Sequence, residues 1–87
     1  NLVNTMKKNP RLRIEVRGYT DDVGDEKFNQ KLSEKRADAV TDYMIKNGIS
    51  PERIKGAGFG EKNPIADNKT AEGRNKNRRT EFFIADK

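Results

Sequence analysis

The segment RLRIEVRG, at residues 11–18, alternates between charged and apolar side chains without a break up to its final glycine. An extended chain places Leu12, Ile14 and Val16 on one face and the charged residues on the other. This period of two predicts a β-strand with one dry face and one solvated face. The segment therefore restricts the chain to layered folds in which another element covers the dry face of a sheet.

The composition permits only a small core. Leu, Ile, Val and Phe together account for 17 of the 87 residues, while 38% of all residues are charged. That content is close to the limit at which charged chains stop folding, and the length leaves no room for a second core. We therefore expect a single domain spanning residues 1–87. Because the sequence opens on Asn1 rather than on methionine, we also expect an excised fragment.

Capping residues and hydrophobic spacing predict the other elements. A helix that ends near Lys46 begins with Asp25 and Glu26, which place negative charge at its positive end, and Asn47 and Gly48 are its candidate left-handed caps. The remaining predictions are the end of a helix at residues 1–8, a short strand at residues 53–60 that loses order in turn glycines, one helical turn near residues 70–76, and a last strand at residues 79–86.

This order of elements predicts an α+β fold, with one mixed sheet and helices packed on one of its faces. The strand, helix and strand between Leu12 and Ala57 are long enough to form a right-handed crossover between two parallel strands.

One cation interrupts the apolar side of the predicted long helix. On a helical wheel, Arg36 lies in the middle of an arc formed by Phe28, Leu32, Ala39, Val40, Tyr43 and Met44. A guanidinium is always charged and costly to bury unpaired, so Arg36 either covers the core edge with its aliphatic stem or binds a ligand. Asp21 lies just before this helix, and the two charges on facing walls of a cleft would grip a zwitterion.

Conventional catalysis is excluded by composition. The chain has no histidine and no cysteine, and Ser33 and Ser50 are its only serines, so no nucleophile and base can be paired. We expect no enzyme, no cofactor and no metal site. The acidic cluster at residues 21–26 is better suited to capping a helix than to acid–base chemistry, and it lacks the alternating ligands of a calcium loop. No apolar run approaches the roughly 18 residues of a membrane span.

The net charge of +5 and the run RNKNRR, at residues 74–79, favour polyanionic partners. A solvated loop is the ordinary explanation of such a run, and a surface for phosphates or carboxylates is the functional one. Single-stranded nucleic acid also needs stacking aromatics, for which Tyr19, Phe59, Phe82 and Phe83 are the few candidates.

Three segments resemble the OmpA C-terminal-like family, the peptidoglycan-binding domain that also occurs in peptidoglycan-associated lipoproteins and flagellar stator proteins. They are residues 18–40, 48–68 and 72–82, which carry the G-x-T-D, N-x-x-L-S-x-x-R-A and N-R-R motifs in the family's order and spacing. Tyr19 replaces the usual histidine, and Thr80 replaces the usual valine. The family's first strand and most of its first helix precede Asn1, so the resemblance implies a domain truncated at its N-terminus.

The resemblance implies a non-catalytic anchor that holds a Gram-negative outer membrane, or one of its proteins, to the cell wall from the periplasmic side. Its ligand is the diaminopimelate of the peptidoglycan stem peptide, bound by Asp21 and Arg36. The same comparison assigns hydrogen bonds to Thr20 and Asn29, a lining role to Leu32 and an extended positive wall to Arg78. Two alternatives stay open: a module of the same fold that binds other envelope proteins, and a basic RNA-binding domain.

Overall fold

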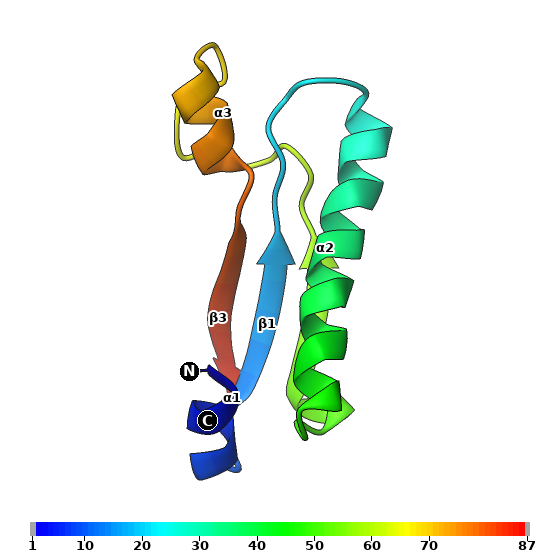
Figure 1. Ribbon diagram of the computed structural model, residues 1–87, viewed down its shortest axis with the longest axis vertical. Helices are drawn as coiled ribbons and strands as arrows, with labels where there is room; N and C mark the ends of the chain where they lie inside the picture. The colour runs from blue at the N-terminus through cyan, green and yellow to red at the C-terminus, as the bar shows by residue number, and fades with distance from the viewer. Residues whose placement is uncertain (1, 87) are drawn as a thin grey trace.

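A computed structural model of the chain describes residues 2–86, and the side chains of residues 2–85. The fold is elongated, with principal extents of 42 × 20 × 19 Å. Figure 1 shows α1 at one end of the molecule and α3 at the other, with the sheet and α2 between them. In chain order the elements are α1 (Leu2–Lys8), β1 (Arg13–Gly18), α2 (Glu26–Lys46), the short 3₁₀ helix η1 (Pro51–Arg53), β2 (Ile54–Gly58), α3 (Ala71–Asn77) and β3 (Thr80–Asp86).

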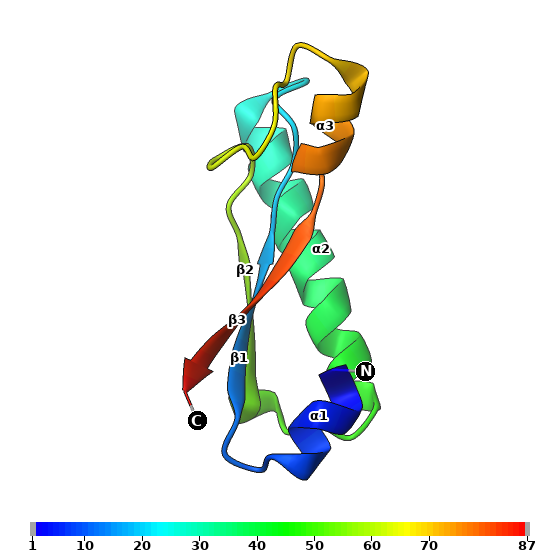
Figure 2. The ribbon, with the colours of Figure 1, turned by 90° about the vertical axis from the view of Figure 1, so that its left-hand side faces the viewer.

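The three strands form one mixed sheet in the order β2-β1-β3. The alternating segment forms the central strand, which pairs in parallel with β2 and antiparallel with β3. The long helix α2 makes the crossover between the two parallel strands and lies along one face of the sheet (Figures 1 and 2). The predicted α+β layer with a mixed sheet is confirmed.

Both longer connections lead into helices that begin with a side-chain cap. Asp25 accepts a hydrogen bond from the backbone N–H of Phe28 at 3.2 Å, and Thr70 accepts one from Gly73 at 2.9 Å. At the other end of α2, Gly48 has a φ of +101°, whereas the φ of Asn47 is −92°. The predicted acidic start of α2 is thus confirmed, and of its two predicted left-handed caps only Gly48 is one.

The core is small and lies between α2 and the sheet. Its buried members are Met6, Ile14, Val16, Ala37, Met44, Ile49 and Ile54. The prediction that the apolar arc of α2 faces the core is wrong for Phe28 and Tyr43, which are each 63% exposed, and for Ala39, which is also exposed. The buried face of α2 is made of small and polar residues instead, namely Asn29, Ser33, Ala37 and Thr41, followed by Met44.

Glycines in the strands explain this choice of helix face. A Cβ added to Gly18 would lie 2.3 Å from the carbonyl oxygen of Ser33, and one added to Gly58 would lie 2.5 Å from the backbone nitrogen of Glu34. The helix therefore packs with its backbone close to the sheet, which only small side chains on both sides allow. The prediction of turn glycines after residue 55 is wrong for Gly56 and Gly58, which lie in β2, while Gly60 adopts a φ of +58° in the following turn.

Within residues 2–86, no helix combines the length and the apolarity needed to cross a membrane. The same part of the chain holds no group of three acidic side chains close enough to share a metal ion.

Candidate functional site

Three connections meet at one end of the sheet. β1 ends at Gly18, and the chain then turns through residues 19–25 into α2. On the other side of β1, the last residues of α3 lead through Arg78 and Arg79 into β3. Figure 1 shows the turn and α3 at the same end of the molecule. The turn after β1 therefore lies beside the start of β3, although the two are far apart in the sequence.

Asp21 is the acidic centre of this end. Its side chain is 11% exposed, and one carboxylate oxygen lies 2.5 Å from Nη1 of Arg78. The other oxygen accepts a hydrogen bond from the backbone N–H of Val23 at 3.0 Å. Arg78 also donates to Oδ1 of Asn75 at 3.4 Å. The ion-pair partner of Asp21 is therefore Arg78 and not Arg36.

Arg36 reaches the same turn from α2. It is half-buried, and its Nη1 lies 3.5 Å from the carbonyl oxygen of Tyr19, two residues before Asp21. At that distance the hydrogen bond is weak, so most of the hydrogen-bonding capacity of the guanidinium is left for other acceptors. Leu32 is half-buried one helical turn before Arg36 and lies on the same side of α2.

Thr20 and Asn29 shape the turn that carries Asp21. The hydroxyl of Thr20 donates to the carbonyl oxygen of Asp21 at 2.8 Å. The side-chain amide of Asn29 donates to the carbonyl oxygens of Asp21 and Val23, at 3.4 and 3.0 Å. Both side chains are buried. Their donor groups bond to the backbone of the turn and so hold the Asp21 carboxylate in position.

A stack of side chains that was not predicted from the sequence lies on the face of the sheet opposite α2. Tyr19 is 2% exposed, its ring stacks on Phe59 with centroids 5.5 Å apart, and the guanidinium carbon of Arg79 lies 3.8 Å from its ring centre. Arg17 continues this stack, 5.2 Å from the ring centre of Phe59 and 4.0 Å from that of Phe83. The available signal was the alternation of β1, which extends past Gly18 to place Tyr19 on the same face as Arg17.

These contacts bear on the RNA-binding alternative. Tyr19 is buried, and the ring of Phe59 contacts both Tyr19 and Arg17. Glu15 pairs with Arg17, and this carboxylate raises the pKa of the Arg17 guanidinium above its ordinary value. Because Tyr19, Phe59 and Arg17 are engaged with one another, these two rings do not form an open platform for nucleic-acid bases, and Phe83 is the exposed ring of this stack.

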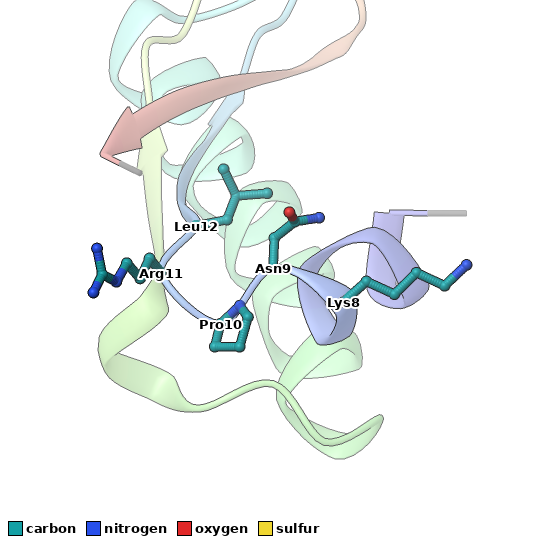
Figure 3. Close-up of a pocket in the computed structure, with 5 residues that line it drawn as sticks. All are labelled: Lys8, Asn9, Pro10, Arg11 and Leu12. Atoms are coloured by element: carbon teal, nitrogen blue, oxygen red, sulfur yellow. The ribbon is translucent and has the colours of Figure 1, made fainter.

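A hollow at the other end of the molecule lies away from this site. It has a volume of about 670 Å³ and is lined by residues 8–12, between α1 and β1. Figure 3 shows Lys8 and Arg11 pointing in different directions from the chain. The two cations therefore do not converge on a common ligand position there.

Comparison with known proteins decides the family. Residues 1–78 match the sequence profile of the OmpA family. The chain belongs to the OmpA family. It is 47% identical, over 84 residues, to "Outer membrane porin F" of Pseudomonas fluorescens, a match that covers 97% of this chain and 26% of that protein. It is 42% identical, over 83 residues, to "Peptidoglycan-binding protein ArfA" of Mycobacterium bovis, covering 95% of this chain and 26% of that protein.

Solved structures give the same answer for the fold. The peptidoglycan-associated lipoprotein from Burkholderia pseudomallei superposes with a TM-score of 0.89 at 26% identity, covering 93% of this chain and 69% of that one. The relatives and structures that match this OmpA-family chain are named as a porin, a peptidoglycan-binding protein and a peptidoglycan-associated lipoprotein, none of them an enzyme, in agreement with the prediction. It spans about a quarter of the length of the two curated relatives, 26% in each case.

Proposed function

We propose that this domain binds peptidoglycan non-covalently through the diaminopimelate of the stem peptide, and so anchors an outer membrane or an envelope protein to the wall from the periplasmic side. The observation that carries the proposal is the mostly buried Asp21 carboxylate, 2.5 Å from Arg78 and on the turn that Arg36 also reaches. The peptidoglycan-binding relative in the same family supports it.

The charges suit a zwitterionic ligand. The free end of diaminopimelate carries an ammonium group and a carboxylate. Asp21 would receive the ammonium, while Arg36 and Arg78 would receive the carboxylate, as charge-assisted hydrogen bonds. Arg78 already pairs with Asp21, so binding exchanges partners: the ammonium joins Asp21 and the ligand carboxylate compensates Arg78.

The remaining predicted residues support the clamp, by which we mean Asp21, Arg36 and Arg78. Thr20 and Asn29 hold the backbone of the turn, and their hydroxyl and amide oxygens remain potential acceptors for the ligand ammonium. Leu32, one turn before Arg36, would line the aliphatic part of the ligand. A preorganised carboxylate of this kind loses little entropy on binding.

Sedimentation with purified, protein-free peptidoglycan tests the proposal. The unaltered domain should pellet with the wall, and Asp21→Asn should remain in solution. Glu52→Gln is the matched control for net charge, because it also removes one negative charge and Glu52 is exposed in η1, at the start of β2 and so at the opposite end of the sheet from Asp21. If the domain does not pellet, or if Asp21→Asn pellets equally well, the proposal is wrong.

One observation favours docking to another envelope protein as the second candidate. Tyr43, Phe82 and Ile84 are 63%, 48% and 61% exposed, and Tyr43 and Phe82 border a hollow of about 210 Å³ between α1, α2 and β3. Exposed apolar surface of this kind is typical of interaction sites. In the same assay, a docking module would show no affinity for the bare wall.

A further inference from the structure

Tyr19 is held near the site through both its ring and its backbone. Its ring contacts Phe59 and the guanidinium of Arg79, and its backbone N–H donates to the carbonyl oxygen of Arg79 at 2.9 Å. The side chain and the main chain of Tyr19 are therefore both tied to Arg79. Such a double contact fixes the position of β1 relative to β3 at the point where both strands approach the site.

Arg79 is itself held by three further groups. Its Nε lies 2.5 Å from a carboxylate oxygen of Glu81, and its Nη2 and Nη1 donate to the carbonyl oxygens of Asn63 at 2.8 Å and Asn77 at 3.3 Å. The side chain is 13% exposed. A guanidinium with its donors used in this way is a rigid support, because moving it would break several bonds together.

All three charged residues of the site are linked to Tyr19 or Arg79. Asp21 follows Tyr19 by two residues, and Arg78 directly precedes Arg79. The carbonyl oxygen of Tyr19 accepts the hydrogen bond from Arg36. A shift of Tyr19 against Arg79 would therefore change the distance between Asp21 and Arg78 and move the acceptor of Arg36.

We propose that Arg79 is a positioning residue for the ligand site and acts through Tyr19. It touches no ligand; it holds the ends of β1 and β3 in the register that places Asp21 beside Arg78. The inference rests on the proposed peptidoglycan binding for its functional consequence, while the positioning itself has a separate readout in the Val23 N–H, which bonds to the Asp21 carboxylate.

The chain contains a matched control. Arg17 also pairs with a glutamate two residues away on its own strand, and it also lies over an aromatic ring, 4.0 Å from the centre of Phe83 against 3.8 Å for Arg79 and Tyr19. Phe83 lies within β3, beyond the end that leads to Arg78. Arg17→Met therefore removes the same kinds of interaction but leaves the contact between Tyr19 and Arg79 in place, although Arg17 also contacts Phe59.

The experiment compares Arg79→Met with Arg17→Met by wall sedimentation and by hydrogen exchange of the Val23 amide. Arg79→Met should weaken wall binding by about tenfold, the usual range for loss of a desolvated cation–π contact, and should speed exchange at Val23. Arg17→Met should change neither by more than about twofold while melting at a similar temperature.

Equal losses in the two methionine variants, or unchanged Val23 exchange in Arg79→Met, would overturn the inference. Should Arg79→Met fail to fold, Arg79→Lys takes its place, because it keeps the charge but loses the bonds to Asn63 and Asn77. Unchanged Val23 exchange and binding in Arg79→Lys would then count against positioning. If the unaltered domain itself does not bind the wall, the proposed function fails, and Val23 exchange alone decides the inference.

Discussion

Asp21 and Arg78 are 57 positions apart in the sequence, and their side chains form an ion pair of 2.5 Å at the end of the sheet. The pair is asymmetric in exposure, at 11% for Asp21 and 40% for Arg78. The carboxylate is thus fixed within the protein, while the guanidinium lies at its surface and can move to another acceptor. This arrangement underlies the exchange of partners that we propose for ligand binding.

Substitution of Asp21 or Arg36 should abolish wall binding without unfolding the domain. Asp21→Asn keeps an oxygen for the Val23 N–H but loses the charge, and Arg36→Ala removes a half-buried cation with one weak hydrogen bond. We expect each change to weaken binding by at least about tenfold, as for loss of a hydrogen bond to a charged group. Circular dichroism melts and wall sedimentation measure the two effects. If Arg36→Ala unfolds the domain, or still binds the wall normally, Arg36 covers the edge of the core and does not bind the ligand.

Free diaminopimelate should release the domain from the wall, whereas lysine should do so poorly. Lysine supplies the side-chain ammonium for Asp21 but has no second carboxylate at that end, so it would leave the guanidiniums of Arg36 and Arg78 uncompensated. We expect lysine to compete at least about tenfold less well, because an unpaired charge costs more than a neutral contact. Equal competition by the two amino acids would mean that only Asp21 recognises the ligand.

Salt should weaken wall binding only modestly. A zwitterion held by one carboxylate and two guanidiniums exchanges few ions, whereas an RNA bound along the basic surface would release many. Removing two exposed cations outside the clamp, with Arg13→Ala and Lys76→Ala together, should leave wall binding unchanged. Salt titrations on wall and on single-stranded RNA test this. Tight RNA binding near physiological salt that the double variant loses, without retention on the wall, would reverse the functional assignment.

Gly58 should tolerate no side chain. A Cβ there would lie 2.5 Å from the backbone nitrogen of Glu34 and 2.6 Å from Oγ of Ser33, so Gly58→Ala must push α2 away from the sheet. We expect a loss of about 2 kcal/mol or more in the free energy of unfolding. Gly24→Ala is the control: its φ is +92° but no atom lies within 4 Å, so it should cost about 1 kcal/mol. Urea unfolding measures both, and a smaller loss at Gly58 would disprove the close approach.

Asn77 should hold the connection between β2 and α3. This fully buried side chain accepts from the N–H groups of Ile65 and Ala66, at 2.8 and 3.0 Å, and donates to Ala66 and Asn68, at 2.9 and 2.7 Å. Asn77→Ala leaves these groups unpaired and should cost about 2–3 kcal/mol. Hydrogen exchange at Ile65 and Ala66 should rise accordingly. Unchanged exchange there would show that other contacts order the connection.

The parts of the fold that depend on local pattern could be predicted from the sequence. The strict alternation through Leu12, Ile14 and Val16 indicated the central strand, and Asp25 indicated the start of α2. The orientation of α2 could not be predicted, because helical spacing favoured an arc through Phe28 and Tyr43. The face that packs on the sheet is chosen by Gly18, Gly56 and Gly58, which permit close approach only to small side chains. The orientation of α2 thus depends on the helix and the strands together, and not on the helix sequence alone.

The candidate site could likewise be predicted only in part from the sequence. Asp21 and Arg36 stand out because one lies before a helix and the other interrupts its apolar side. The pairing of Asp21 with Arg78, and the support of Tyr19 by Arg79, depend on the antiparallel pairing of β1 with β3. No spacing in the sequence specifies that register, so these contacts became apparent only in the structure.

The most direct test follows the Val23 amide by NMR while diaminopimelate is added to the isotope-labelled domain. The Val23 N–H bonds to the Asp21 carboxylate, so its signal reports on the proposed ammonium position itself. We predict that the signals of Val23 and Tyr19 shift and saturate with diaminopimelate, that equal concentrations of lysine shift them far less, and that Asp21→Asn removes the response. No shift at Val23, or shifts confined to the hollow at residues 8–12, would contradict the account.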